Sequence, residues 1–205
     1  MTQDTSDLDR LAAVTPSALA RLIAAVLTPG NVVAAVTLFV AIRHSSSVLA
    51  GIGWAALTLL LVVGLPYLIL FRAMRTGRAD DRQVVRRSQR PALMLAALAC
   101  VAVALTVLAL LGAPRQLIVL IIAMAGGLAA MTLVTLRWKA SMHMAVAAGA
   151  VAIAGLETPI GWTTALLLPL IGWARWRDGR HSVGQLIGGA IIGALAAASI
   201  YSLLT

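Results

Sequence analysis

The chain of 205 residues is 61% apolar (AVILMFWYC) and only 11% charged, with a formal net charge of +9. Soluble domains average about 45–50% apolar and about 25% charged residues, and disordered chains are poorer still in apolar residues. A water-soluble globule and a disordered chain are therefore excluded. We expect an all-α protein that crosses a membrane several times.

Residues 1–21 come before the first apolar run and predict an amphipathic helix that lies on the membrane surface. Thr5 or Ser6 is a candidate N-cap, and Leu8 and Leu11 belong to the apolar side of this helix. Residues 22–205 then form one transmembrane domain.

Seven apolar runs follow, and about 20 apolar residues are enough to span the hydrocarbon core of a bilayer. The runs cover residues 22–42, 48–71, 91–114, 116–136, 142–156, 159–174 and 182–205. We therefore predict a bundle of six to seven transmembrane helices. Pro29-Gly30-Asn31 interrupts the first run and predicts a kink or break there. Glycines in the last run predict close helix packing, namely Gly184, Gly188, Gly189 and Gly193.

The basic residues are distributed unevenly across the predicted membrane. Of sixteen Lys and Arg, only Arg43 and Arg115 fall on one side, and the other fourteen fall opposite them. The positive-inside rule makes the side with fourteen cytoplasmic in a multi-pass protein of the cell membrane. The positive charge is confined to loops at one membrane surface, so anionic lipid is the expected partner and nucleic acid is not.

Most polar residues fall in three groups, each at the end of an apolar run: residues 81–91, 137–143 and 175–185. Two crossings separate each group from the next, so all three are expected at the same membrane face. The groups carry arginines and a lysine, which bind phosphate oxygens, and a serine that donates a hydrogen bond. They also carry His143 and His181, which have the chemistry of a nucleophile and a proton donor.

At these residues the sequence resembles the type 2 phosphatidic acid phosphatase (PAP2) superfamily. The three motifs of that family are Lys-x6-Arg-Pro, Pro-Ser-Gly-His and Ser-Arg-x5-His-x3-Asp. Arg90-Pro91 matches the end of the first motif, and Ser141-x-His143 matches the second. Arg175, followed after five residues by His181, matches the core of the third. The resemblance also covers the motif order and the membrane ends on which the motifs sit, across roughly residues 80–190.

The resemblance implies a membrane-embedded phosphatase that acts on lipid phosphates or (iso)prenyl diphosphates, with no metal and no cofactor. His181 would attack phosphorus and form a phosphohistidine, and His143 would protonate the leaving oxygen. The phosphoryl oxygens would be held by Arg90, Lys139, Ser141 and Arg175. Phosphatidic acid and isoprenoid diphosphates are the leading substrate candidates, and the sequence does not choose between them.

The sequence departs from the family pattern at three places. Gln83 replaces the lysine of the first motif, so Arg82 or Arg86 must supply that charge, and we favour Arg82. The proline and glycine of the second motif are replaced as well, by Ala140 and Met142.

The third departure is Gln185, which replaces the aspartate that orients the nucleophilic histidine. His181 and Gln185 are spaced i, i+4 and are expected to share a helix face. An amide oxygen there accepts the Nδ1 hydrogen bond, but it stabilises an imidazolium less than a carboxylate does. The changes at Gln83 and Gln185 leave an alternative open, namely a catalytically weak relative that binds or transports phospholipids. The uninterrupted apolar runs argue against a small transporter of another kind.

Several polar residues also have a purely structural interpretation. Lys139 fits both phosphate binding and a snorkelling position at the interface. Arg177 and Arg180 are interpreted as stop-transfer charges, and Asp178 as too isolated for a metal site. On the far face, His44 and Glu157 are interpreted as loop residues.

Overall fold

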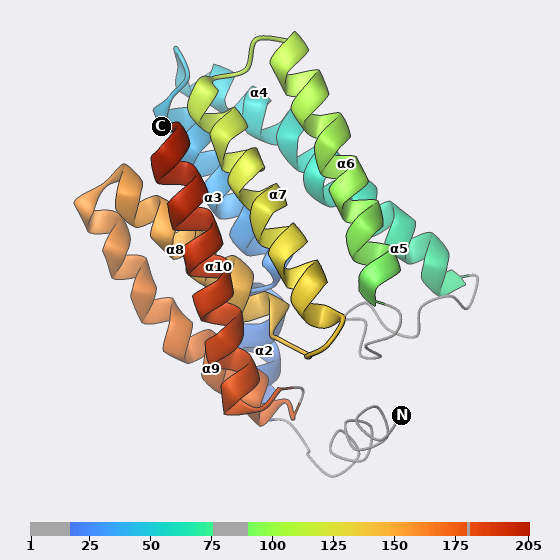
Figure 1. Ribbon diagram of the computed structural model, residues 1–205. Helices are drawn as coiled ribbons and strands as arrows, with labels where there is room; N and C mark the ends of the chain where they lie inside the picture. The colour runs from blue at the N-terminus through green and yellow to red at the C-terminus, as the bar shows by residue number, and fades with distance from the viewer. Residues whose placement is uncertain (1–16, 76–89, 180) are drawn as a thin grey trace.

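Each of the seven apolar runs is helical in a computed structural model of the chain (Figure 1). The structure describes residues 17–75, 90–179 and 181–205, and the side chains of 90–93 are not included. Of the described residues, 86% are helical and none lies in a strand. The predicted all-α class is therefore confirmed. Of the predicted surface helix, residues 1–16 lie outside the described residues.

The first apolar run forms two helices, α2 (Ala18–Val26) and α3 (Pro29–Arg43), bent by 42° at the break between them. Thr28 is the N-cap of α3, and its hydroxyl accepts a hydrogen bond from the Asn31 N–H at 3.2 Å. Pro29 occupies the first helical position, where its missing N–H leaves no bond unmade. The predicted break is confirmed, and it falls just before the proline because the proline starts α3.

The second run forms one long helix of three parts, α4 (Val48–Leu59), η1 (Leu60–Gly64) and α5 (Leu65–Arg75). The middle part, η1, is a π-helical turn, which is wider than an α-helical turn. The helix as a whole, Val48–Arg75, has 28 residues and is apolar enough to cross a membrane.

The remaining helices alternate in direction along the bundle (Figure 1). Consequently α5, α7 and α9 end, and α6, α8 and α10 begin, at one end of the molecule, which we call the basic end because Arg137, Lys139 and Arg175 lie there. The opposite end holds the ends of α3, α8 and α10. The elements are α6 (Arg90–Leu110), α7 (Arg115–Thr135), α8 (Met142–Glu157), the 3-10 helix η3 (Pro159–Leu166), α9 (Leu167–Arg177) and α10 (Val183–Leu204).

Among the described residues, fewer helices than predicted are long and apolar enough to span a bilayer, and α6 enters this comparison only as Met94–Leu110. In the described part of the chain, Val48–Arg75, Arg115–Thr135 and Val183–Leu204 qualify, and the bent pair α2–α3 makes a fourth if it counts as one span. The helix α8 has 16 residues and is only about 24 Å long, against a hydrocarbon core of about 30 Å. The structure therefore supports a membrane protein, whereas the count of six to seven spans stays a prediction.

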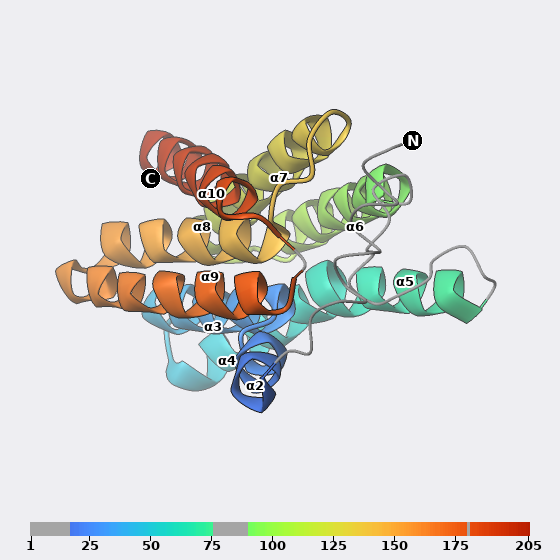
Figure 2. The ribbon, with the colours of Figure 1, turned by 90° about the horizontal axis from the view of Figure 1, so that it is seen from below.

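The helices α8 and α10 pack closely because glycines remove side chains from their contact. A Cβ atom added to Gly193 would overlap the carbonyl oxygen of Ala145, and one added to Gly189 would overlap that of Ser141. On the α8 side of the same contact, Gly149 faces Gly193 and Ala197 of α10. The close packing predicted from Gly189 and Gly193 is thus confirmed. Seen from the basic end, α8 lies between α10 and α9 (Figure 2).

Replacing Gly193 by alanine should destabilise the fold by about 1–3 kcal/mol, because the methyl group forces α10 away from the α8 backbone. Gly127→Ala in α7 is the matched control, since nothing lies within 4 Å of the added Cβ atom. That control should leave the melting temperature unchanged or raise it, because alanine favours a helix. Thermal unfolding in detergent measures both effects, and equal melting temperatures for the two variants would contradict the packing described.

Candidate functional site

The second polar group lies in the connection from α7 to α8. Lys139 is 3% exposed and Ser141 is fully buried. Ser141 occupies the N-cap position of α8, yet its hydroxyl makes no capping bond. Within the described residues, the buried Ser141 Oγ has no hydrogen-bond partner. A buried hydroxyl of this kind is costly unless a ligand or water completes its bonding, so Ser141 is a candidate ligand-binding group.

The third polar group lies between α9 and α10. Arg175, in the last turn of α9, is 2% exposed, and its Nη1 donates to Oδ2 of Asp178 at 3.0 Å. Asp178, which the sequence left without a role, therefore holds the guanidinium at the end of α9. Arg177 is exposed, in keeping with its interpretation as a stop-transfer charge.

The predicted contact between His181 and Gln185 is present, but it does not arise from a shared helix face. His181 precedes the helix, because Ser182 is the N-cap of α10 and forms a capping box with Gln185. The side chain of Gln185 reaches back, so that its Oε1 lies 3.3 Å from Nδ1 of His181. The expectation that both residues share a helix face is therefore wrong, although the contact itself is present.

The same contact fixes the tautomer of the His181 ring. The backbone N–H of Ser182 donates to the same Gln185 atom at 3.2 Å, and an N–H only donates. The atom is therefore the amide oxygen, which only accepts. Nδ1 of His181 must then carry the proton, and in the neutral ring Nε2 is the unprotonated nitrogen.

A backbone hydrogen bond joins the second and third groups. The N–H of Ser141 donates to the carbonyl oxygen of Gln185 at 3.0 Å, next to the close approach of Gly189. His143, the second residue of α8, is 9% exposed. Five buried residues from the second and third polar groups belong to elements that meet at the basic end, namely Lys139, Ser141, His143, Arg175 and His181.

The first polar group falls largely outside what the structure describes. Arg82 lies in residues 76–89, which are not described, and so do Gln83 and the alternative Arg86. Arg90 is the first residue of α6, at the basic end, but its side chain is not described. The predicted roles of Arg82 and Arg90 in phosphate binding therefore stay predictions.

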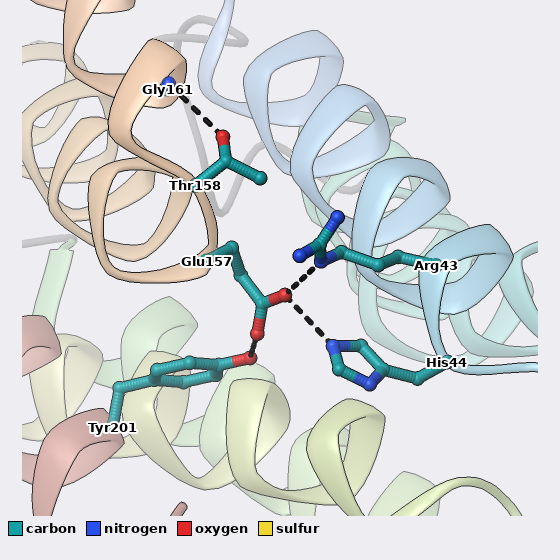
Figure 3. Close-up of polar contacts among 6 residues, drawn as sticks. All are labelled: Arg43, His44, Glu157, Thr158, Gly161 and Tyr201. Carbon is teal, nitrogen blue, oxygen red and sulfur yellow. Dashed lines mark hydrogen bonds and ion pairs between the residues drawn. The ribbon is translucent and has the colours of Figure 1, made fainter.

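A second polar cluster, at the opposite end of the bundle, corrects the interpretation of Glu157 as a loop residue and gives His44, which does lie in the turn after α3, a buried partner (Figure 3). Glu157 is the last residue of α8 and its side chain is only 6% exposed. Its Oε2 lies 2.9 Å from Nε of Arg43 and 2.8 Å from Nε2 of His44, and its Oε1 accepts from the hydroxyl of Tyr201. The cluster ties α8 to α3 and α10.

Glu157 lies just beyond the apolar run 142–156, and its surroundings act on its pKa in opposite directions. Burial has the largest single effect and raises the pKa. The hydrogen bonds from Tyr201 and His44, with the electrostatic interactions with His44 and Arg43, together outweigh burial. The pKa of Glu157 is therefore below its usual value, and the carboxylate is the stable form at neutral pH.

No grouping of three His, Cys, Asp or Glu side chains suited to a metal ion occurs among the residues that the structure describes. Comparison of the chain with protein-family models, with curated proteins and with solved structures finds no match.

Glu157→Gln should lower stability at pH 7 by about 1–3 kcal/mol, because the amide leaves its charged partners poorly paired. The carboxylate contributes fully above the unfolded pKa of about 4.3, and this contribution is lost as the pH falls through the lower folded pKa. The difference in melting temperature between wild type and variant should therefore be smaller at about pH 3 than at pH 7. Thermal unfolding of both proteins at the two pH values measures this difference. Equal differences at both pH values would contradict the ion-pair account.

Proposed function

We propose that the protein is a membrane-embedded, metal-independent phosphatase that hydrolyses lipid phosphates or (iso)prenyl diphosphates through a phosphohistidine, in the manner of the PAP2 superfamily. One observation carries the proposal. The residues that match the second and third motifs are buried at the same end of the bundle, with Ser141 bonded to the backbone of Gln185. Cationic and hydroxyl side chains buried at a membrane interface suit a phosphate group held at the depth of the lipid headgroups.

The proposed reaction has two steps. In the first, Nε2 of His181 bonds to phosphorus while the bond from phosphorus to the lipid oxygen breaks, and His143 gives its proton to that oxygen. In the second, water attacks the phosphohistidine, His143 takes the proton, and phosphate leaves with His181 restored. Gln185 is a positioning residue, because its oxygen holds the proton on Nδ1 and aims Nε2 away from itself.

Candidate partners for the phosphoryl oxygens lie at the same end of the bundle as His181. Arg175 presents a planar guanidinium whose Nη1 is held by Asp178, and the Ser141 hydroxyl supplies a neutral donor. Lys139 adds a second buried positive charge. These groups stabilise the charge that develops on the transferring phosphoryl group. Arg82 and Arg90 complete the proposed set from the first motif.

The proposed site requires a particular arrangement in the cell membrane. Six to seven crossings, with the apolar runs 91–114, 142–156 and 159–174 included, leave the basic end on the cytoplasmic face by the positive-inside rule. The lipid substrate then enters from the cytoplasmic leaflet, with its phosphate at the basic end and its chains among the helices. Nothing in this arrangement selects between phosphatidic acid and isoprenoid diphosphates.

Phosphate release in detergent with EDTA present tests the proposal, with phosphatidic acid and farnesyl diphosphate as substrates. Wild type should release phosphate from at least one of them, and His181→Ala should abolish release because no phosphohistidine forms. Arg175→Gln should lower kcat about 10²- to 10³-fold, and the exposed Arg177→Gln is its matched control. Release by His181→Ala at the rate of wild type would overturn the proposal.

The replacement of the family aspartate by Gln185 favours a second candidate, a lipid-phosphate binding or transport protein with little catalysis. An amide does not stabilise the imidazolium form of His181 as a carboxylate does. Tight binding of phosphatidic acid by wild type without release of phosphate would select this candidate over the phosphatase.

Variants of Gln185 should separate positioning from charge. Gln185→Leu removes the acceptor for Nδ1 and should lower kcat about 10- to 100-fold. Gln185→Asp restores a carboxylate and should raise kcat about tenfold, while it shifts the acidic limb of the pH–rate profile upward through the pKa of His181. Phosphate release measured across the pH range checks both effects. An unchanged pH profile in Gln185→Asp would show that the residue does not act through His181.

A further inference from the structure

A groove opens on the side of the bundle, away from the basic-end residues of the proposed function. It has a volume of about 500 Å³ and lies between the start of α3 and the helix made of α4, η1 and α5. Its walls are mostly apolar, with Asn31 and Tyr67 as the polar side chains. The residues that matter for its shape are Gly30, Asn31, Ala34, Leu60, Gly64 and Tyr67.

Two glycines and the π-helical turn account for the groove. Gly30 leaves room beside Tyr67, since a Cβ atom there would lie 3.3 Å from Cε2 of the Tyr67 ring. Gly64, at the end of η1, carries no side chain into the space, and a Cβ atom there would meet only Leu60 and Leu59 of its own helix, at 3.6 Å or more. The π-helical turn Leu60–Gly64 contains one residue more than an α-helical turn, and this extra residue interrupts the regular packing surface of the helix.

The place of the groove on a candidate membrane span indicates that it faces lipid rather than water. Its longer wall belongs to Val48–Arg75, a candidate membrane span, and Leu60 on that wall is 65% exposed. Water gains little in an apolar groove because it finds too few polar partners there. In a bilayer the space is filled by a hydrocarbon chain.

A positively charged residue, Arg75, lies on the same helix face as Tyr67, further along α5 toward the basic end. In α5, Tyr67, Phe71 and Arg75 follow one another at intervals of four residues and so lie on neighbouring positions of one face. Arg75 is exposed, and its guanidinium carbon lies 4.5 Å from the centre of the Phe71 ring. From Tyr67 to Arg75 the helix rises about 12 Å, which takes the face from the apolar groove to the basic end.

We propose that this groove binds one anionic phospholipid, with an acyl chain between α3 and the π-helical turn and the headgroup phosphate at Arg75. The ring of Phe71 holds the guanidinium on the groove face through a cation–π contact. Anionic lipids are concentrated in the cytoplasmic leaflet, which is the leaflet that the basic end faces under the positive-inside rule. The bound lipid is a ligand of the fold and is not the substrate of the proposed phosphatase.

Native mass spectrometry of the full chain in detergent tests the proposal by counting bound lipids. The probes are dioleoyl phosphatidylglycerol and dioleoyl phosphatidylcholine, which share their acyl chains and differ in net charge. Wild type should bind one phosphatidylglycerol about fivefold more tightly than phosphatidylcholine, as expected for one arginine near the headgroup. Arg75→Gln should remove this preference, and the exposed Arg177→Gln, which loses the same charge at the same end, should keep it.

A second pair of variants tests the groove itself. Gly64→Trp fills the groove and should weaken binding of both lipids about tenfold or more. Gly53→Trp lies on the same helix with nothing within 4 Å of its Cβ atom, and it should bind both lipids as wild type does. Unchanged binding in Gly64→Trp, equal binding of the two lipids by wild type, or equal effects of Arg75→Gln and Arg177→Gln would each overturn the proposal. Since binding is measured and not turnover, a failure of the phosphatase proposal leaves this result unaffected.

Discussion

The arrangement of the bundle depends on the contact between α8 and α10. Glycines at 189 and 193 bring α10 onto the carbonyl oxygens of Ser141 and Ala145, closer than any side chain permits. The backbone bond from Ser141 to Gln185 fixes the helices at the basic end, and the bond from Tyr201 to Glu157 fixes them at the opposite end. Because α8 begins beside His143 and α10 begins just after His181, the contact between these helices also determines where the two histidines lie.

The two ends of this helix pair use polar residues in different ways. At the opposite end, the Glu157 carboxylate is bonded to Arg43, His44 and Tyr201, so its charge is compensated within the chain. At the basic end, lysine, arginine and histidine side chains are buried with the unbonded hydroxyl of Ser141. The guanidinium of Arg175 is paired with the Asp178 carboxylate there, and the buried hydroxyl of Ser141 is the group that the phosphatase proposal assigns to a lipid phosphate. The carboxylate at the opposite end is thus compensated within the chain, whereas ligand binding at the basic end is a proposal.

The sequence was informative where hydrophobic periodicity decides the structure, but the local capping-box pattern of Ser182 and Gln185 was missed. Apolar runs predicted the helices, and the even number of crossings predicted that the second and third polar groups meet at one end. The burial of Glu157 was not predictable in this way, because its partners His44 and Tyr201 lie 113 and 44 residues away in the chain. The position of His181 outside α10 follows from the capping box of Ser182, which competes with simple helical spacing. The groove beside η1 depends on a π-helical turn, which no residue pattern in the sequence predicts.

The most direct test of the account is to find where phosphate becomes attached to the protein during turnover. The purified protein is mixed with phosphatidic acid that carries a radioactive phosphate, the reaction is stopped in base, and the labelled peptide is identified. The account predicts a label that is stable in base, labile in acid and located on His181. Phosphate release that continues while His181 carries no label, or a label on another residue, would contradict it.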